Sequence, residues 1–316
     1  MIEARGLTKR YGDKLAVDDL TFTIRPGVVT GFLGPNGAGK STTMRMLIGL
    51  DAPTAGTATI NGRAYIEHPA PLREVGALLE ARAIHTGRSA RNHLLALAAT
   101  TGIPKRRVDE VIDLVGLSDV AGKRVGGFSL GMGQRLGIAS ALLGDPGTLI
   151  LDEPVNGLDP EGILWIRNLL KNLAAEGRTI FVSSHLMSEM ALTASHLIVV
   201  GRGRLLADVT VQELTKMASR DQVKVRTPHA ARLRSLLAGE GVVITGRDDD
   251  LLEVSGIDST EIGLVAAGAG IPLVELTPQH ASLEEAFMEV TRDAVEFITP
   301  QEVDDFAVVM TGRNDA

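Results

Sequence analysis

The feature that most constrains the fold is the segment GPNGAGKST at 34–42, which directly follows the apolar run VVTGFL at 28–33. The segment matches G-x-x-x-x-G-K-[ST] in full, and its flanks predict a strand before it and a helix after it. Glycines let backbone amides turn toward phosphate oxygens, and the N-terminus of a helix adds positive potential. The sequence therefore predicts a phosphate-binding turn within an α/β sheet.

This turn contributes most of the candidate nucleotide-binding residues. Lys40 supplies a mobile positive charge for the β- and γ-phosphates of a nucleoside triphosphate. The hydroxyl of Ser41 is a hard oxygen ligand of the kind that Mg²⁺ prefers. The full candidate set is Gly34, Pro35, Asn36, Gly37, Ala38, Gly39, Lys40, Ser41 and Thr42.

A second motif, TLILDEP at 148–154, places two carboxylates at the end of an apolar strand. Asp152 is placed to orient Mg²⁺ through its water ligands, and Glu153 to polarise a water for in-line attack on the γ-phosphate. Taken alone, the motif could be a solvated acidic turn. Its position downstream of a phosphate-binding turn in the same predicted sheet favours a catalytic site.

The order of predicted elements indicates two domains and a tail. Strands alternating with helices up to residue 219 predict a mainly parallel sheet flanked by helices. From 220 to 290, short strands and helices follow one another closely, which predicts a small α+β domain. The acidic segment 291–316 is expected to be a mobile tail.

Composition excludes several other classes of protein. The net charge of −7 argues against broad nucleic-acid binding, so no nucleic-acid partner is expected. With no cysteine, disulfide scaffolds, thiolate zinc sites and cysteine nucleophiles are excluded. The longest uncharged apolar stretch, 262–274, is shorter than the ~20 residues of a spanning helix, so a soluble chain is expected.

Three further motifs lie in this part of the chain: FSLGMGQR at 128–135, GLDP at 157–160 and TIFVSSH at 179–185. Together with the phosphate-binding turn and the two carboxylates, they make residues 1–215 resemble the ATP-binding subunit of an ABC transporter. FSLGMGQR at 128–135 stands where that family has its signature, and GLDP at 157–160 matches its D-loop. His185, which ends TIFVSSH, matches the family's switch histidine. Tyr11 falls where the family stacks an aromatic ring on adenine. The resemblance implies an ABC-type P-loop ATPase fold with a helical signature subdomain at about 82–140.

The resemblance also implies roles for residues and partners. Ser129 and Gly131 would reach the γ-phosphate bound by a second copy of the chain, and Asp159 would lie at the seam of this ATP-dependent homodimer. His185 would contact the γ-phosphate and the attacking water. A separate integral-membrane permease is the implied partner, with the chain held at the cytoplasmic face of the membrane. The resemblance is to the antibiotic and multidrug exporter subgroup.

The sequence departs from the family pattern at two places. Leu130 and Met132 replace a glycine and the glutamine of the signature. No glutamine lies between Ser41 and Gly133, where the family has its Q-loop, and Glu80 after the strand-like VGALLE takes that place. We therefore expect Glu80 to be a further acid near Mg²⁺, although an ionised carboxylate cannot donate a hydrogen bond as an amide does.

Two other functions compete with an ATPase that drives a permease. One is a soluble ABC ATPase that regulates a ribosomal or nucleic-acid process, but this chain carries a single ATPase cassette and no cysteine motif. The other is a regulatory binder that holds ATP without hydrolysing it. Lys40, Asp152, Glu153 and His185 are all present and count against that reading, whereas Glu80 and Met132 count slightly for it.

Overall fold

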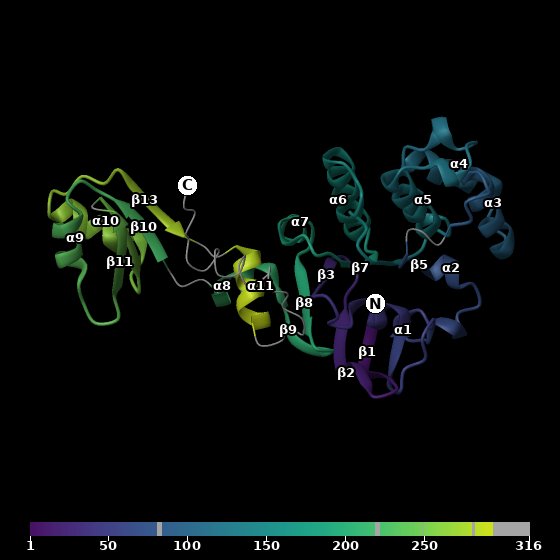
Figure 1. Ribbon diagram of the computed structural model, residues 1–316, viewed down its shortest axis with the longest axis horizontal. Coiled ribbons are helices and arrows are strands. Elements are labelled where there is room, and N and C mark those ends of the chain that lie inside the picture. The colour runs from purple at the N-terminus through teal and green to yellow at the C-terminus, as the bar shows by residue number, and fades with distance from the viewer. Residues whose placement is uncertain (81–83, 219–221, 249, 280–281, 293–316) are drawn as a thin grey trace. The chain divides into compact units, whose positions relative to one another are not determined.

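A computed structural model describes residues 1–80, 84–218, 222–248, 250–279 and 282–292. The described part of the chain divides into two compact units (Figure 1), one formed by residues 1–210 with 290–292 and the other by residues 211–289. The break after Thr210 lies ahead of the expected domain boundary at residue 219. Most of the expected tail, 293–316, lies outside the described residues.

The first unit alternates strands with helices along most of its length. Short 3₁₀ turns lie at Tyr65–Glu67, Ser118–Val120 and Val125–Gly127. The main elements are β1 (Ile2–Tyr11), β2 (Lys14–Ile24), β3 (Val29–Leu33), α1 (Lys40–Leu47), β4 (Ala55–Ile60), α2 (Pro71–Glu74), β5 (Val75–Leu78), α3 (Ala90–Thr101), α4 (Lys105–Leu114), α5 (Leu130–Leu142), β6 (Thr148–Leu151), α6 (Pro160–Ala175), β7 (Thr179–Ser183), α7 (Met187–Thr193), β8 (His196–Gly201) and β9 (Arg204–Thr210).

The main sheet of this unit has the strand order β5-β6-β7-β3-β8-β9. All neighbours are parallel except β8 and β9, which form an antiparallel edge. Strands β3, β6 and β7 are buried along their whole length, as expected for parallel strands covered on both faces. The carboxyl ends of β3, β5, β6 and β7 therefore meet at one edge, where ligands bind in open α/β sheets.

A second, antiparallel sheet with the order β2-β1-β4 packs against the main sheet through a shared core. Three phenylalanines mark this contact: Phe22 lies on β2, Phe32 on β3 and Phe181 on β7. Their ring centroids are 4.9 to 6.1 Å apart. Tilted rings at this spacing add to the stabilisation from apolar burial, so the cluster fixes the strand that leads into the phosphate-binding turn.

Helices α3, α4 and α5 group together in the first unit (Figure 1). They lie within the segment expected to be a helical subdomain. Helix α5 approaches β5 closely, because a Cβ atom on Gly76 would lie 2.0 Å from the carbonyl oxygen of Ala141. Gly137 also lies close to this strand, because an added Cβ would be 2.6 Å from the side chain of Leu78. These small residues place α5 directly beside the strand that precedes Glu80.

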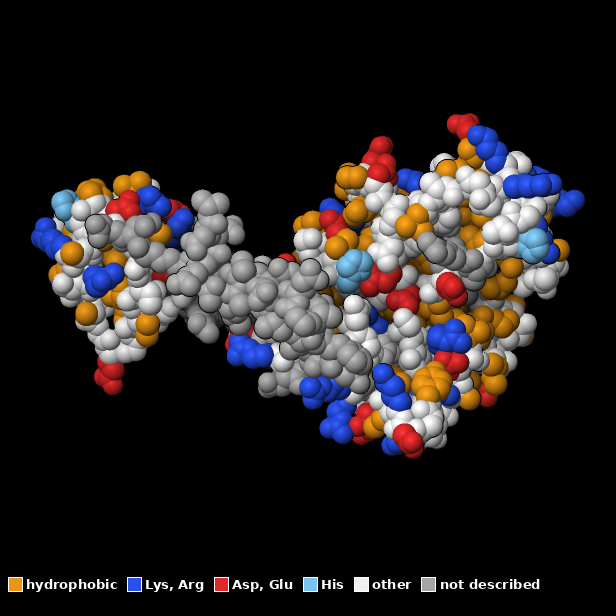
Figure 2. All heavy atoms as spheres, viewed as in Figure 1, with side chains coloured by type: hydrophobic (Ala, Val, Ile, Leu, Met, Phe, Trp, Pro, Cys, Tyr) orange, Lys and Arg blue, Asp and Glu red, His pale blue; other side chains and the backbone are white. Residues whose placement is uncertain are grey.

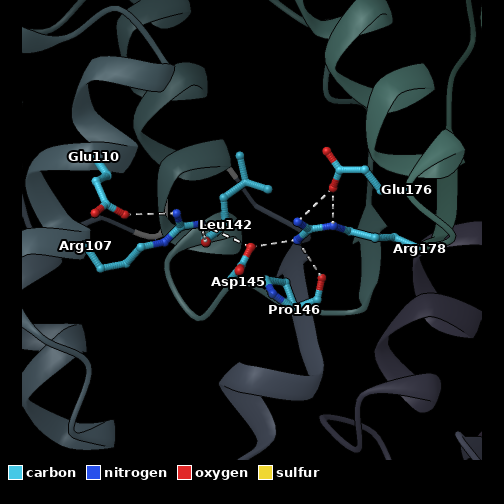
Figure 3. Close-up of polar contacts among 7 residues, drawn as sticks. All are labelled: Arg107, Glu110, Leu142, Asp145, Pro146, Glu176 and Arg178. Atoms are coloured by element: carbon cyan, nitrogen blue, oxygen red, sulfur yellow. Dashed lines mark hydrogen bonds and ion pairs between the residues drawn. The ribbon is translucent and has the colours of Figure 1, made fainter.

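An ionic network joins α4 to the loops before β6 and β7 (Figure 3). Asp145 accepts a hydrogen bond of 2.8 Å from Arg178, and Arg107 lies 3.4 Å from the same carboxylate oxygen. Arg178 also binds Glu176 at 3.0 Å, and Arg107 binds Glu110 at 3.3 Å. The hydrogen bonds from Arg178 and its charge lower the pKa of Asp145 below its usual value. The network therefore links the helical group to the main sheet.

The second unit contains a four-stranded antiparallel sheet of order β11-β12-β10-β13, and its buried core packs against α9 and α10. The order of elements from β10 is βαββαβ, as in ferredoxin-like folds. The bounds are α8 (Val211–Ala218), β10 (Gln222–Arg226), α9 (Ala230–Leu237), β11 (Val243–Asp248), β12 (Leu251–Ser255), α10 (Ser259–Gly268), β13 (Glu275–Gln279) and α11 (Leu283–Thr291). In the described part of the chain, no helix is long and apolar enough to cross a membrane.

Candidate functional site

The phosphate-binding turn leaves β3 at Leu33 and enters α1 at Lys40, so the predicted residues 34–42 form this loop and the first turn of the helix. Two glycines are required by close contacts. A Cβ on Gly34 would lie 2.4 Å from the carbonyl oxygen of Val200, and one on Gly39 would lie 2.5 Å from that of Ala16. Gly39 also has a φ of 97°, which favours glycine. The loop is thus fixed by its neighbours in a conformation that only glycine fits.

The ammonium group of Lys40 folds back over the loop. Its Nζ donates hydrogen bonds to the carbonyl oxygens of Gly34 at 2.5 Å and Pro35 at 3.2 Å. Burial lowers the pKa of Lys40, and the nearby charges of Glu153 and Asp152 oppose that shift. Figure 2 shows basic, acidic and apolar side chains interspersed on the visible surface. At the site itself, the Lys40 ammonium group, the loop amides and the start of α1 would supply positive potential for a bound phosphate.

Ser41 and Asp152 meet across the end of the sheet. The Ser41 hydroxyl donates to Oδ2 of Asp152 at 2.7 Å, and Ser183 donates to Oδ1 at 2.5 Å. The backbone amide of Asp152 donates to the carbonyl of Leu78 at 2.7 Å, which ties this residue to the end of β5.

These oxygen donors fit Mg²⁺, which takes few protein ligands and completes its shell with water and phosphate. Among the described residues, no three His, Asp or Glu side chains gather into a metal site built by protein alone. The residues present therefore suit an ion shared with a bound nucleotide.

Glu153 is held in an unusual backbone conformation. Its φ of 50° lies in the left-handed region, which non-glycine residues rarely adopt. Its carboxylate accepts hydrogen bonds from His185, at 2.8 Å from Nδ1 and 3.3 Å from the backbone amide. Since an ionised carboxylate only accepts, Nδ1 carries the proton. The pair lies at the ends of β6 and β7, beside Lys40 and Asp152.

Two residues at this site were missed by sequence reasoning. Ser183 ends β7 and is fully buried; its hydroxyl also accepts a hydrogen bond of 2.9 Å from the amide of Glu153. Gln134 on α5 donates to the carbonyl of Glu153 at 3.0 Å. A serine at the end of the strand that leads to His185 was a usable signal. Gln134 lies directly after the segment between Ser41 and Gly133, where the family's Q-loop glutamine was expected.

Tyr11 lies at the hairpin between β1 and β2, with its side chain 47% exposed. Its hydroxyl donates to Asp51 at 2.9 Å, and Arg45 binds the same carboxylate at 2.8 and 3.2 Å. The ammonium of Lys9 lies 4.9 Å from the ring centroid and donates to the carbonyl of Ala52. Desolvation, and then the bond to Asp51, raises the pKa of Tyr11. The ring is therefore tethered to the segment that follows α1.

Glu80 lies two residues beyond β5 and is exposed. The carbonyl of Leu78, two residues earlier, accepts a hydrogen bond from the backbone amide of Asp152. This bond fixes the end of β5, just before Glu80, next to Asp152. Its charge also helps to raise the pKa of Arg45. Residues 81–83 lie outside the described residues.

Ser129, Gly131 and Asp159 form a separate group. Ser129 caps α5 by accepting from the amide of Met132 at 3.2 Å, and Asp159 caps α6 by accepting from the amide of Gly162 at 3.0 Å. An added Cβ on Gly131 would lie 2.7 Å from the carbonyl oxygen of Gly157. The signature segment and the D-loop segment are therefore packed together within one chain, and both capping residues remain exposed.

Comparison with known proteins agrees with this arrangement. Residues 17–156 match the family model described as ABC transporter, and residues 221–284 match one described as "Domain of unknown function (DUF8746)". The chain is 45% identical over 219 residues to the bacitracin transport ATP-binding protein BcrA of Bacillus licheniformis, which covers 68% of this chain and 72% of that protein.

Solved structures show the same fold. A structure described as the ATP binding subunit of an ABC transporter matches with a TM-score of 0.64 and 27% identity, covering 69% of this chain and 92% of that one. A dimeric ATP-binding cassette in a post-hydrolysis state, bound to ADP and Pi, matches with a TM-score of 0.61 and 23% identity over 66% of this chain and 98% of that one. The chain belongs to the ATP-binding subunits of ABC transporters, a family of ATPases.

Proposed function

We propose that this chain hydrolyses ATP at the site formed by the phosphate-binding turn, Asp152, Glu153 and His185, and thereby powers export through a separate permease. The observation that carries the proposal is the contact of 2.8 Å between His185 and Glu153, at the same sheet edge as the bond of 2.7 Å between Ser41 and Asp152. A binder that had lost hydrolysis would have no need to keep both pairs oriented. The geometry therefore favours turnover over regulatory binding.

In this proposal Lys40 and the loop amides bind the β- and γ-phosphates, and Ser41 and Asp152 hold Mg²⁺. When bound, the ion neutralises charge on the phosphate oxygens. Glu153 accepts a proton from the attacking water at its carboxylate, while the water oxygen forms a bond to the γ-phosphorus and the bond to the leaving ADP oxygen breaks. His185 keeps that carboxylate in place through Nδ1 and presents Nε2 toward the nucleotide.

The partners follow from the family and the relatives. A match to a dimeric cassette supports an ATP-dependent homodimer in which Ser129 and Gly131 of one copy close over the γ-phosphate on the other. Asp159 then lies at the seam, and Tyr11 stacks on adenine. The relative named for bacitracin transport supports export of an antibiotic or similar small molecule. The relatives named as transport ATP-binding proteins also support a position at the cytoplasmic face of the membrane, where the permease would hold the chain.

The proposed catalytic role is tested with Glu153→Gln. We expect this variant to bind ATP as the parent does and to hydrolyse it at least 100-fold more slowly, because the cradle is intact and the proton acceptor is gone. With ATP it should accumulate a homodimer on size-exclusion chromatography. Glu161→Gln, at an exposed acid on α6, is the matched control and should behave as the parent. Lys40→Ala should bind nucleotide weakly and form no ATP-dependent dimer.

Hydrolysis at the parental rate by Glu153→Gln would refute the assignment of the catalytic carboxylate. The transport role is tested separately, by identifying an integral-membrane protein encoded beside the gene for this chain and co-expressing the two. Co-purification from membranes and stimulation of the ATPase would support it. A parent enzyme that hydrolyses ATP but never associates with such a protein would refute the permease assignment.

A further inference from the structure

Gln134 lies on α5 between Gly133 and Arg135, and its side chain is buried, with only 2% of the residue exposed. Its amide nitrogen lies 3.0 Å from the backbone carbonyl oxygen of Glu153. Because that carbonyl can only accept, the orientation of the amide is fixed and Nε2 is the donor. A buried amide in a helix is costly unless it is paired, so this contact determines how the side chain lies.

The peptide of Glu153 needs such support. Its left-handed φ of 50° is a conformation that persists in a non-glycine residue only when the surroundings hold it. Ser183 holds the amide at 2.9 Å. The carbonyl is held by Gln134 and by the amide of Asn156 at 3.2 Å. Of these three partners, only Gln134 comes from the helical group.

We propose that Gln134 is a positioning residue for hydrolysis, whose amide holds the Glu153 peptide so that the carboxylate stays aimed at the attacking water. The inference rests on the proposed catalytic role of Glu153. Ser129, which caps α5, lies five residues before Gln134, a rise of about 7.5 Å along a rigid helix. A displacement of the signature turn is therefore passed to the Glu153 carbonyl through the helix and one hydrogen bond.

The first test is Gln134→Met, which keeps the length of the side chain and removes the donor. We expect kcat to fall about tenfold, equivalent to about 1.4 kcal/mol of transition-state stabilisation. KM and the Kd for ATP should stay at the parental values, because Gln134 does not touch the phosphate-binding loop. The matched control is Ser140→Ala, which removes a hydrogen bond of 2.9 Å within the same helix, to the Leu136 carbonyl.

The second test is Gln134→Glu. Changing the pH changes the hydrogen bonding of this side chain while its size stays the same, so the effect of hydrogen bonding is separated from that of packing. An ionised carboxylate would repel the Glu153 carbonyl, whereas the protonated form would donate to it, and burial favours the protonated form. The ratio of the variant's kcat to the parental kcat should rise at least threefold from pH 8 to pH 6. The parent and Gln134→Met, measured at the same pH values, serve as the references for this ratio. For Gln134→Met the ratio should stay flat.

The outcomes separate this inference from the proposed function. Parental kcat in Gln134→Met, with slow hydrolysis by Glu153→Gln, would overturn the role of Gln134 and leave the catalytic assignment in place. Fast hydrolysis by Glu153→Gln would instead overturn the proposed function. If Gln134→Met does not fold, the Gln134→Glu ratio decides alone: a ratio that does not change between pH 6 and pH 8 overturns the inference.

Discussion

Ser183 offers the sharpest perturbation of the site, because one hydroxyl serves both carboxylate residues. The side chain is fully buried; it donates to Asp152 at 2.5 Å and accepts from the Glu153 amide at 2.9 Å. Ser183→Ala leaves a buried N–H without its partner, at about 1–3 kcal/mol, and removes a hydrogen bond to a charged group worth about 1.5–3 kcal/mol. Asp152 keeps its bond to Ser41, so we expect a total loss of about 3 kcal/mol.

For a unit of this size, about 3 kcal/mol lowers Tm by about 6–12 °C. Trp165 is the single tryptophan of the chain and lies on α6, so its fluorescence reports the unfolding of the first unit. We also expect kcat to fall by about 10- to 100-fold, because both carboxylates lose their orientation.

The control is Ser184→Ala at the adjacent buried serine, whose hydroxyl binds only the amide of Leu186 among the hydrogen bonds of the described chain. It should cost about 1 kcal/mol and leave kcat near the parental value. Equal Tm and kcat for Ser183→Ala and the parent would refute the claim that this hydroxyl holds the two carboxylates.

Three further predictions concern the periphery of the site and the ionic network. Glu80→Gln removes a negative charge near the proposed Mg²⁺ site, so isothermal titration should show tighter Mg-ATP binding and steady-state kinetics should show a higher hydrolysis rate. No change in either quantity would place Glu80 outside the site. Asp51→Ala frees the Tyr11 hydroxyl and should weaken binding of a fluorescent ATP analogue about threefold, whereas Asp51→Asn, which keeps an acceptor, should bind within twofold of the parent. Asp145→Asn should lower the unfolding free energy by about 1 kcal/mol at pH 7, the range of largely exposed ion pairs. The hydrogen bond from Arg178 lowers the pKa of Asp145 in the folded state. That difference is therefore fully present above the unfolded pKa of about 4 and is lost progressively as the pH falls through the lower folded pKa; a difference that does not begin to fall below pH 4 would contradict the charge pairing.

The ATPase fold was predictable because its signals are local. An apolar strand, a glycine-rich turn and a helix follow one another within 28–50, and the second strand with its two carboxylates lies within 148–154. Parallel strands then bring those ends together at one edge of the sheet. The family comparison and the structural matches confirm the family and the α/β fold.

The supporting contacts were not predictable, since they join residues far apart in the sequence. The Tyr11–Asp51 and Gln134–Glu153 bonds depend on how a hairpin and a helix pack. The left-handed backbone conformation of Glu153 was not predictable either, because a glutamate in the sequence normally indicates a negative φ.

The last strand of the second unit, β13, spans Glu275–Gln279, so it begins near the end of the apolar run PLVEL at 272–276. Val274 is 71% exposed, and pairing with β10 begins at Glu275 opposite Arg226. Lys224 on β10 forms an ion pair of 3.2 Å with Glu275. Pairing with β10 thus extends from Glu275 to Gln279, and Pro278 is tolerated because β13 is an edge strand.

The central position of β3 has a consequence for synthesis of the chain on the ribosome. This strand is buried throughout, and among the described strands it pairs with β7 and β8, which follow about 150 residues later. At about 5–20 residues per second, β3 emerges from the ribosome about 8–30 s before either partner is made. During that interval, β3 has neither of the strands with which it pairs. The nascent chain is therefore exposed to aggregation, and its yield in cells should depend on chaperones that bind short apolar segments.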